Sequence, residues 1–368
     1  MKIVVSCDAL VARDYAVSVV EAMLLLYENA ELYTIVHHEG KIIGPVEQRK
    51  IHSSFLSRLL NSDFPYDDSW WKKGHLIPGA LKKLHIPCSV DLVINISSGF
   101  SQGISKCEGV KQVTYLVENQ FEKRKPRFLR EKIFRGYLEN WAEKALLNTD
   151  ELWVTTQKSF DYWSQKHKNV SLLPPFFKAT DFPLFPEATR KVFPNDFFAL
   201  DAESMNTELA LEIGENLIHE NFKFKFIGRD EHLQSAKEKL GTKAEFWGER
   251  CAGELAPILA AARGYISFQK AGFPIQVIEA LSTGTPAWLP ESSKSLDFLD
   301  RDKVGLFTGK SFLSEKKDLF DKMNGLDLKK IHGSVTRFHD LKFRAWVHRR
   351  LSKIKDSPVV EQSDCSTC

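Results

Sequence analysis

Short segments that are apolar throughout alternate with helix-like segments along the first half of the chain. Residues 2–7, 31–37 and 91–96 are rich in valine, isoleucine and leucine and have the length of strands, while the apolar segment 16–27 has the length of a helix. Strands that are apolar at every position, rather than at every second one, are typical of a parallel sheet covered by helices on both faces. We therefore predict an α/β fold with a doubly wound sheet.

A second series of the same kind follows a proline-rich stretch. Residues 174–186 are interpreted as an interdomain linker, because clustered prolines favour extended backbone. Beyond them, residues 196–200 and 222–227 have the pattern of strands, and residues 207–219 have that of a helix.

The two series predict two Rossmann-like domains, at residues 1–185 and 190–333. A helix at residues 334–354 and a polar tail at residues 355–368 complete the chain. Doubly wound domains bind their ligands beyond the carboxyl ends of the strands, where we expect the functional site.

Composition narrows the class of protein. The chain has 368 residues, 43% hydrophobic and 27% charged, which is enough for the cores of two domains. The net charge of +3 gives no general basis for nucleic-acid binding. No segment reaches the roughly 20 apolar residues of a membrane span, and the N-terminus has the pattern of a strand rather than a signal peptide. We expect a cytoplasmic protein.

The cysteines are scattered along the sequence. Their spacing predicts neither a disulfide framework nor a zinc site with four ligands. Cys365 and Cys368 have the spacing of a redox pair, but they end the polar tail and are interpreted as solvated. We expect no metal and no other cofactor.

One segment carries a functional pattern. Residues 265–268 are predicted as a buried strand, the Gly272-Phe273-Pro274 turn leads into a short helix, and Gly284-Thr285-Pro286 starts the next strand. Such a turn aims backbone N–H groups and the positive end of a helix at one point, which suits a phosphate. Glu279, about one turn into the helix, would accept hydrogen bonds from a sugar hydroxyl beside it. An ordinary βαβ crossover with a surface glutamate is the alternative.

This segment resembles the donor-site signature of family 4 glycosyltransferases of the GT-B type. Those enzymes carry two glutamates seven residues apart, with Gly-Phe-Gly or Gly-Phe-Pro between them and Gly-Thr-Pro after the second. Glu279 matches the second glutamate, Gly272-Phe273-Pro274 matches the middle, and Ala271 stands at the position of the first.

The resemblance covers most of the chain and implies the GT-B architecture. Weaker matches at residues 54–59, 91–94, 150–156 and 173–175 occur in the order found in mannosyltransferase-like enzymes of envelope polysaccharide synthesis. In that architecture the first domain takes the acceptor, the second takes a nucleotide-sugar, and the last helix crosses back to the first domain.

The same family implies the chemistry at the donor site. Glu279 would bind the nucleotide ribose, and the backbone from Phe273 to Ile275 would lie near the diphosphate. Transfer in the family retains the configuration of the sugar and uses no metal. The partners implied are a nucleotide-sugar and a glycan or lipid-linked acceptor.

The diphosphate clamp of the family is missing. The loop after the first strand of the second domain carries Asp201 and Glu203 where the family has an arginine and a lysine. At about 6 Å, each carboxylate would disfavour each phosphate charge by roughly 3 kcal/mol before salt screening. Arg229, Arg250 and Lys270 follow other predicted strands and are the candidate replacements. The alternative is that they are solvated loop bases.

The first domain departs from the family as well. A histidine that contacts the sugar in the family is replaced by Glu118, which we assign as a candidate catalytic residue that meets an acceptor hydroxyl. Residues 121–135 interleave bases with aromatic side chains. This run predicts peripheral contact with an anionic membrane surface, at the inner face. An ordinary amphipathic helix with a basic outer face is the alternative.

Three functions remain open. The first is a glycosyltransferase of the hexosyl or mannosyl type that acts on an envelope glycan or lipid-linked acceptor. The second is a pseudoenzyme, a GT-B scaffold that has lost its donor and assists an active transferase. The third is a module that binds a glycan or nucleotide without turnover. The fold alone does not choose among them.

Overall fold

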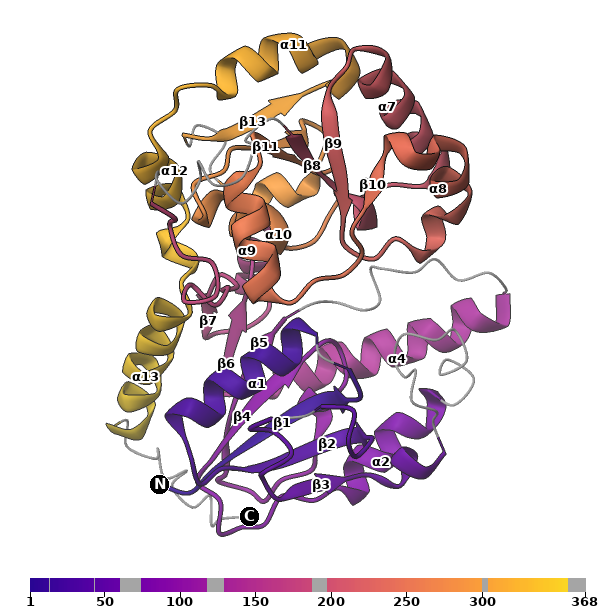
Figure 1. Ribbon diagram of the computed structural model, residues 1–368. Coiled ribbons are helices and arrows are strands. Elements are labelled where there is room, and N and C mark those ends of the chain that lie inside the picture. Colours follow the sequence, from indigo (N-terminus) through magenta and orange to yellow (C-terminus); the bar gives the residue numbers. More distant parts are fainter. Residues whose placement is uncertain are drawn as a thin grey trace, which may run out of the picture. The chain divides into compact units, whose positions relative to one another are not determined.

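A computed structural model describes residues 1–12, 14–42, 44–59, 74–117, 129–186, 197–299 and 304–356. The chain forms two compact units, which Figure 1 colours by sequence. Unit 1 contains Met1–Pro174 and the chain from Phe343 onward, and unit 2 contains Pro175–Lys342. The chain therefore passes into unit 2 between Pro174 and Pro175, ahead of the division drawn at residues 185–190 from the sequence, and returns to unit 1 between Lys342 and Phe343.

Unit 1 is built on a parallel sheet of seven strands in the order β3-β2-β1-β4-β5-β6-β7. The strands are β1 (Ile3–Leu10), β2 (Glu31–His37), β3 (Ile51–Ser53), β4 (Leu92–Ser97), β5 (Lys111–Leu116), β6 (Glu151–Val154) and β7 (Val170–Leu172). The chain order reverses between β1 and β4, which is the switch point of a doubly wound sheet.

Helices cover this sheet on both faces. They are α1 (Tyr15–Leu26), α2 (Ile77–Lys83), α4 (Leu129–Leu147), α5 (Gln157–Ser164) and α13 (Asp340–Asp356). Helix α1 begins after Asp14, whose side chain accepts a hydrogen bond from the N–H of Val17 at 2.9 Å and so caps the first turn. Helices α2 and α4 share a core with β1, β2 and β4.

The last helix, α13, packs against unit 1. Phe343, Val347 and Leu351 recur every fourth residue and are buried, which gives the helix one apolar face. The Phe343 ring lies 5.6 Å from that of Tyr115 on β5, and Trp346 lies edge-on to Trp153 of β6 at 5.1 Å. Arg350 also donates a hydrogen bond to Glu151. A helix that returns to the first domain was expected, although it begins at Asp340 rather than at residue 334.

Unit 2 is built on a parallel sheet of six strands in the order β10-β9-β8-β11-β12-β13 (Figure 1). The strands are β8 (Phe197–Asp201), β9 (Lys223–Ile227), β10 (Glu245–Phe246), β11 (Gly264–Ile266), β12 (Ala287–Pro290) and β13 (Leu306–Gly309). Ranked along the chain, this is the strand order of a Rossmann sheet, with its switch point between β8 and β11.

Alternate side chains of these strands enter two separate cores. Phe197 and Ala199 of β8 pack under α9, α10 and α12, whereas Phe198 and Leu200 pack under α7, α8 and α11. The helices are α7 (Thr207–His219), α8 (Gln234–Leu240), α9 (Ala252–Ala261), α10 (Ile275–Ser282), α11 (Phe312–Met323) and α12 (Leu328–Ser334). Burial on both faces explains the uninterrupted apolar pattern of the strands, and the predicted pair of doubly wound sheets is confirmed.

The proline-rich stretch belongs to unit 2 and is not a free linker. Phe177 and Phe182 are buried in the core under α10, and Ser282 donates a hydrogen bond to the Phe182 carbonyl at 2.7 Å. The linker prediction is wrong here because it weighed the prolines and not the phenylalanines between them, whose burial favours a packed segment.

Among the described helices, none is long and apolar enough to cross a membrane.

Candidate functional site

The switch point of unit 2 brings two loops together. Asp201 ends β8 and Ser267 follows β11, and these strands are neighbours in the sheet. The Ser267 hydroxyl donates a hydrogen bond of 2.6 Å to Oδ2 of Asp201, and both side chains are buried. Asp201 therefore ties the loop after β8 to the loop after β11.

This placement corrects the picture of Asp201 as an open carboxylate facing a phosphate. The side chain of Asp201 is only 2% exposed. Burial raises its pKa to about 6, although hydrogen bonds from Ser267 and Ser204 act in the opposite direction. The sequence could not reveal this, because the partner Ser267 lies 66 residues further along the chain.

The glycine turn is held by a residue that the sequence analysis missed. Gln269 donates from its side-chain amide to the carbonyls of Ala271, at 3.0 Å, and Phe273, at 3.3 Å. Its own N–H donates to the Ser267 hydroxyl at 3.2 Å. Gly272 has φ +91°, a conformation that favours glycine. A chain of hydrogen bonds thus runs from Asp201 through Ser267 and Gln269 to the turn. The only sequence signal for Gln269 is an amide side chain directly before a glycine turn.

Helix α10 starts at this turn with part of its N-terminus unused. The N–H of Ile275 donates to the Phe273 carbonyl at 2.9 Å, and Pro274 has no N–H. The next N–H groups of the first turn belong to Gln276 and Val277, and no side chain within the described ranges caps the helix. The backbone expected from the sequence to meet a phosphate ran from Phe273 to Ile275, whereas the better donors in the structure are these N–H groups one and two residues further along.

Glu279 lies on α10, about one turn beyond its start, and is partly buried. Burial, and to a lesser degree the charge of Asp181, raises the pKa of Glu279 to about 8. No hydrogen bond from a described residue contributes to this shift. A partly buried carboxyl group that accepts no hydrogen bond from a described residue is typical of a site that a ligand completes.

The raised pKa predicts how Glu279 affects stability. The group ionises near pH 4.5 in the unfolded chain and near pH 8 in the folded one, so its contribution is complete below pH 4.5 and is lost as the pH rises to about 8. The variant Glu279→Gln carries no such charge. We expect it to unfold at about the same denaturant concentration as the wild type at pH 4.5. Between pH 4.5 and about pH 8, its free energy of unfolding should rise relative to that of the wild type by up to about 1.4 kcal/mol per pH unit.

Urea denaturation at pH 4.5, 6, 7 and 8.5 measures this difference. Glu238→Gln, which changes an exposed glutamate on α8, serves as the matched control. Parallel stability profiles for the wild type and Glu279→Gln would contradict the assignment.

The candidate bases are placed as follows. Arg229 follows β9 and is 63% exposed, and its Nε lies 3.8 Å from Oε1 of Glu203 and 3.7 Å from Oε2 of Glu249. The N–H of Arg229 also donates to Glu203 at 3.2 Å. The structure therefore supplies a cation to the acidic loop after β8, and the charge of Glu203 is partly balanced.

Arg250 and Lys270 differ in their surroundings. Arg250 donates from Nε to the Trp247 carbonyl at 2.8 Å, and its Nη1 lies 3.7 Å from Glu254. The Lys270 side chain is exposed directly before the glycine turn. Glu118 and residues 121–128 lie outside the described residues, as does the tail with Cys365 and Cys368.

At the switch point of unit 1, a buried aspartate is hydrogen-bonded to the loop after the neighbouring strand, as in unit 2. Asp8 of β1 is buried and accepts hydrogen bonds from the N–H groups of Ser98, at 2.9 Å, and Ser101, at 2.6 Å. Both serines follow β4. Burial raises the pKa of Asp8 above its usual range, and these hydrogen bonds oppose the shift. Each unit thus joins the two loops at its switch point through one aspartate.

Comparison with known proteins identifies the fold. The sequence matches no protein-family model and no curated protein sequence. Among solved structures, sucrose-phosphate synthase from Thermosynechococcus elongatus aligns with a TM-score of 0.71 at 14% identity, over 96% of this chain and 99% of that one. HepE from Anabaena, in complex with UDP-glucose, aligns at 0.64 and 12% identity over 96% and 100% of the two chains. The lipopolysaccharide outer core galactosyltransferase WaaB aligns at 0.61 and 14% identity over the same shares.

Both units and the returning helix are included in these alignments, which cover nearly all of each chain. The protein has the GT-B fold of glycosyltransferases.

Proposed function

We propose that the protein is a glycosyltransferase that takes a nucleotide-sugar against unit 2 and transfers the sugar to an acceptor. The observation that carries this proposal is the Glu279 carboxyl group, which is partly buried and receives no hydrogen bond from a described residue. It lies one turn beyond a helix start that no described side chain caps. A carboxylate that binds sugar hydroxyls and a helix start that binds phosphate are the two features a nucleotide-sugar requires.

The parts of the donor divide between these features. The ribose hydroxyls of the nucleotide donate hydrogen bonds to Glu279. The diphosphate accepts hydrogen bonds from the first-turn N–H groups of Gln276 and Val277. Gln269 keeps the turn in the shape that exposes them. Lys270, exposed at the same turn, supplies positive charge. The complex of HepE with UDP-glucose supports a donor of this class for the present fold.

Catalysis at such a site consists of positioning and of stabilising the departing phosphate. Negative charge grows on the diphosphate as the sugar leaves, and fixed N–H groups at a helix start stabilise that charge without having to reorganise. We further propose that transfer retains the sugar's configuration without a metal, as in family 4, and that the acceptor is an envelope glycan or lipid-linked saccharide. Glu118 remains the proposed contact to the acceptor.

A second candidate is the pseudoenzyme, a scaffold without a donor. It is favoured by the loop after β8, which carries Asp201 and Glu203 and no base. Arg229, the cation nearest to this loop among the described ion pairs, is shared between Glu203 and Glu249. An arginine held by two carboxylates is less available to a diphosphate than a free one.

Calorimetric titration of the protein with UDP, GDP, ADP and CDP separates the two. If the protein is a transferase, one of them should bind with a micromolar Kd, which corresponds to a binding free energy of about −8 kcal/mol. Absence of heat from all four at millimolar nucleotide would favour the scaffold.

The variant Glu203→Gln sharpens the comparison. It removes one acid from the loop and leaves Arg229 with a single carboxylate partner, Glu249. Asp201 is left unchanged because it is buried and bonded to Ser267, so that its replacement would disturb the fold. Binding gained only by Glu203→Gln would mean that the natural protein has lost its donor, whereas binding by both supports the transferase.

A further inference from the structure

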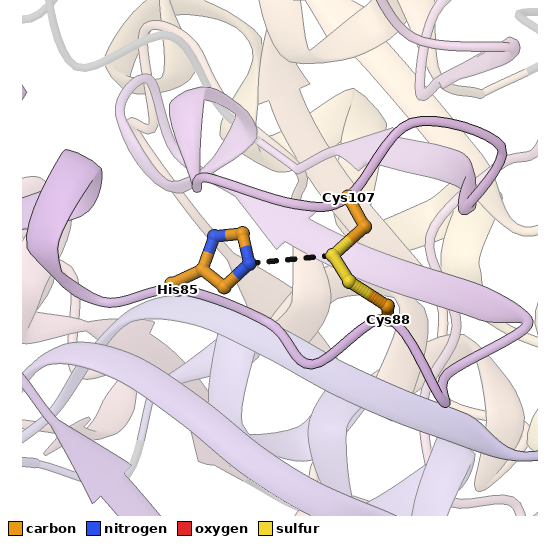
Figure 2. A group of neighbouring side chains, drawn as sticks. All are labelled: His85, Cys88 and Cys107. Carbon is orange, nitrogen blue, oxygen red and sulfur yellow. Dashed lines mark hydrogen bonds between the residues drawn. A yellow bond between two sulfur atoms is a disulfide. The ribbon is translucent and has the colours of Figure 1, made fainter.

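His85, Cys88 and Cys107 form a cluster on unit 1, far in sequence from the proposed donor site (Figure 2). His85 and Cys88 lie between α2 and β4, and Cys107 lies just before β5. The two cysteines form a disulfide with their Cα atoms 5.1 Å apart, and Nε2 of His85 lies 3.4 Å from Sγ of Cys107. The sequence analysis did not find this pair, because 19 residues of chain separate cysteines that adjacent strands bring together.

The backbone holds the two cysteine segments together independently of the disulfide. Ile86 forms a parallel bridge with Lys106, and its N–H donates to the Ser105 carbonyl at 2.9 Å. Ile86 itself is buried in the core beneath the cluster. Reduction of the disulfide therefore leaves both thiols at the same place, with their backbone already ordered.

The histidine is oriented by a second residue. Nδ1 of His85 lies 3.0 Å from the hydroxyl of Ser105. When Nδ1 carries the proton and donates it to Ser105, the lone pair of Nε2 faces the sulfur of Cys107. A hydrogen bond to one ring nitrogen that fixes the other as a ligand is the usual second contact of a metal-binding histidine.

We propose that the reduced protein binds Zn²⁺ through the Sγ atoms of Cys88 and Cys107 and Nε2 of His85, with water as the fourth ligand. The three ligand atoms already lie within 4.8 Å of one another. Zn–S bonds of about 2.3 Å and Zn–N bonds of about 2.0–2.1 Å place tetrahedral ligand atoms about 3.5–3.8 Å apart. Rotation of the cysteine side chains supplies this separation once the sulfurs are no longer bonded.

The ligand set selects the metal. Two thiolates and an imidazole favour Zn²⁺ over Mg²⁺ and Ca²⁺, which prefer oxygen ligands. His85 and Cys88 are exposed, so the ion reaches the site from solvent. The cluster precedes β4 and β5 and therefore lies at the amino edge of the unit 1 sheet, whereas Asp8 and its partners lie toward the carboxyl edge. It is a site distinct from the donor site proposed above.

The disulfide and the zinc site are alternative states of the same cysteines. A dithiol reductant passes two electrons and two protons to the disulfide and becomes a disulfide itself, which leaves two thiols on the protein. Zn²⁺ then displaces both thiol protons, and no electron moves in that step. Either state joins residues 85–88 to the segment before β5.

Co²⁺ is the spectroscopic probe for this site, because thiolate ligands give it an intense charge-transfer absorption in the near ultraviolet. The experiment uses the full chain with Cys365→Ser and Cys368→Ser, reduced with a phosphine and titrated without oxygen. We expect a single equivalent of Co²⁺ to bind with that absorption and Zn²⁺ to displace it. Oxidised protein should give no such band.

Variants assign the ligands. Cys88→Ser and Cys107→Ser should each lower the charge-transfer band by at least half, and His85→Ala should weaken Co²⁺ binding by at least tenfold. Ser105→Ala, which only frees the histidine, should weaken it by about tenfold. Cys251→Ser, which changes an exposed free cysteine of unit 2, is the matched control and should leave the titration unchanged.

Alkylation of the reduced protein that keeps His85, Cys88, Ser105, Cys107 and Cys251 gives a second readout. Zn²⁺ should protect Cys88 and Cys107 from iodoacetamide, as read by peptide mass, and should leave Cys251 reactive. A reduced protein without a cobalt–thiolate band, a band that survives the double change Cys88→Ser and Cys107→Ser, or equal alkylation with and without Zn²⁺ would each overturn the proposal. None of these results depends on nucleotide binding.

Discussion

Replacing Glu279 with alanine is expected to weaken the binding of a nucleoside diphosphate by about 10- to 150-fold. This range corresponds to about 1.5–3 kcal/mol, the usual value of a hydrogen bond that involves a charged group, and it applies above about pH 8, where the Glu279 carboxyl group is ionised. The ligand-free protein should not lose stability through a broken hydrogen bond, because no described residue donates one to this carboxyl group. Loss of affinity without a matching loss of stability distinguishes a ligand-binding residue from a structural one.

Calorimetry with the nucleotide that binds best measures the change. Glu238→Ala removes the same charge from an exposed position on α8 and should leave the affinity within about twofold of the wild type. An unaltered dissociation constant for a folded Glu279→Ala protein would remove Glu279 from the site.

Phe343→Ala is expected to destabilise unit 1 by about 3–5 kcal/mol, the usual cost of deleting a buried phenylalanine. Phe343 is 3% exposed, and its ring meets Tyr115 in the centre of the sheet. The lost contact leaves a cavity at the point where α13 joins the sheet.

Leu341→Ala is the matched control, since Leu341 belongs to the same helix and is 63% exposed. Urea denaturation followed by circular dichroism should show a shift for Phe343→Ala and almost none for Leu341→Ala. Equal shifts for the two variants would mean that α13 does not stabilise unit 1.

The sheets could be predicted because a strand that is buried on both faces is apolar at every position, and this pattern can be recognised in the strand's own sequence. In β8, for example, Phe197 and Phe198 face opposite cores, so the strand is apolar at every position. The turn from Gly272 to Pro274 was also recognisable, because positive φ and the start of a helix restrict which residues fit. In both cases the information is local to the segment.

The parts that escaped prediction depend on partners distant in sequence. Asp201 was taken for an open acid because nothing near it in the chain shows that Ser267 will donate a hydrogen bond to its buried carboxyl group. Cys88 and Cys107 meet only because β4 and β5 are neighbours. Arg229 was recognised as a base near the sheet edge, but its pairing with Glu203 follows from β8 and β9 lying side by side.

The return of the last helix sets the order in which the chain can finish folding during its synthesis. The segments that enter and leave unit 2 are bonded to each other, with the N–H of Phe177 donating to the Phe338 carbonyl at 2.9 Å and that of Asp340 to the Phe177 carbonyl at 3.1 Å. Unit 2 is therefore a closed insertion that can be completed while the part of α13 beyond Lys342 is still inside the ribosome. Tyr115 and Trp153 stay uncovered until α13 emerges. Domains of a growing chain usually fold from the N-terminus onward. In this protein the unit that is started first is completed last.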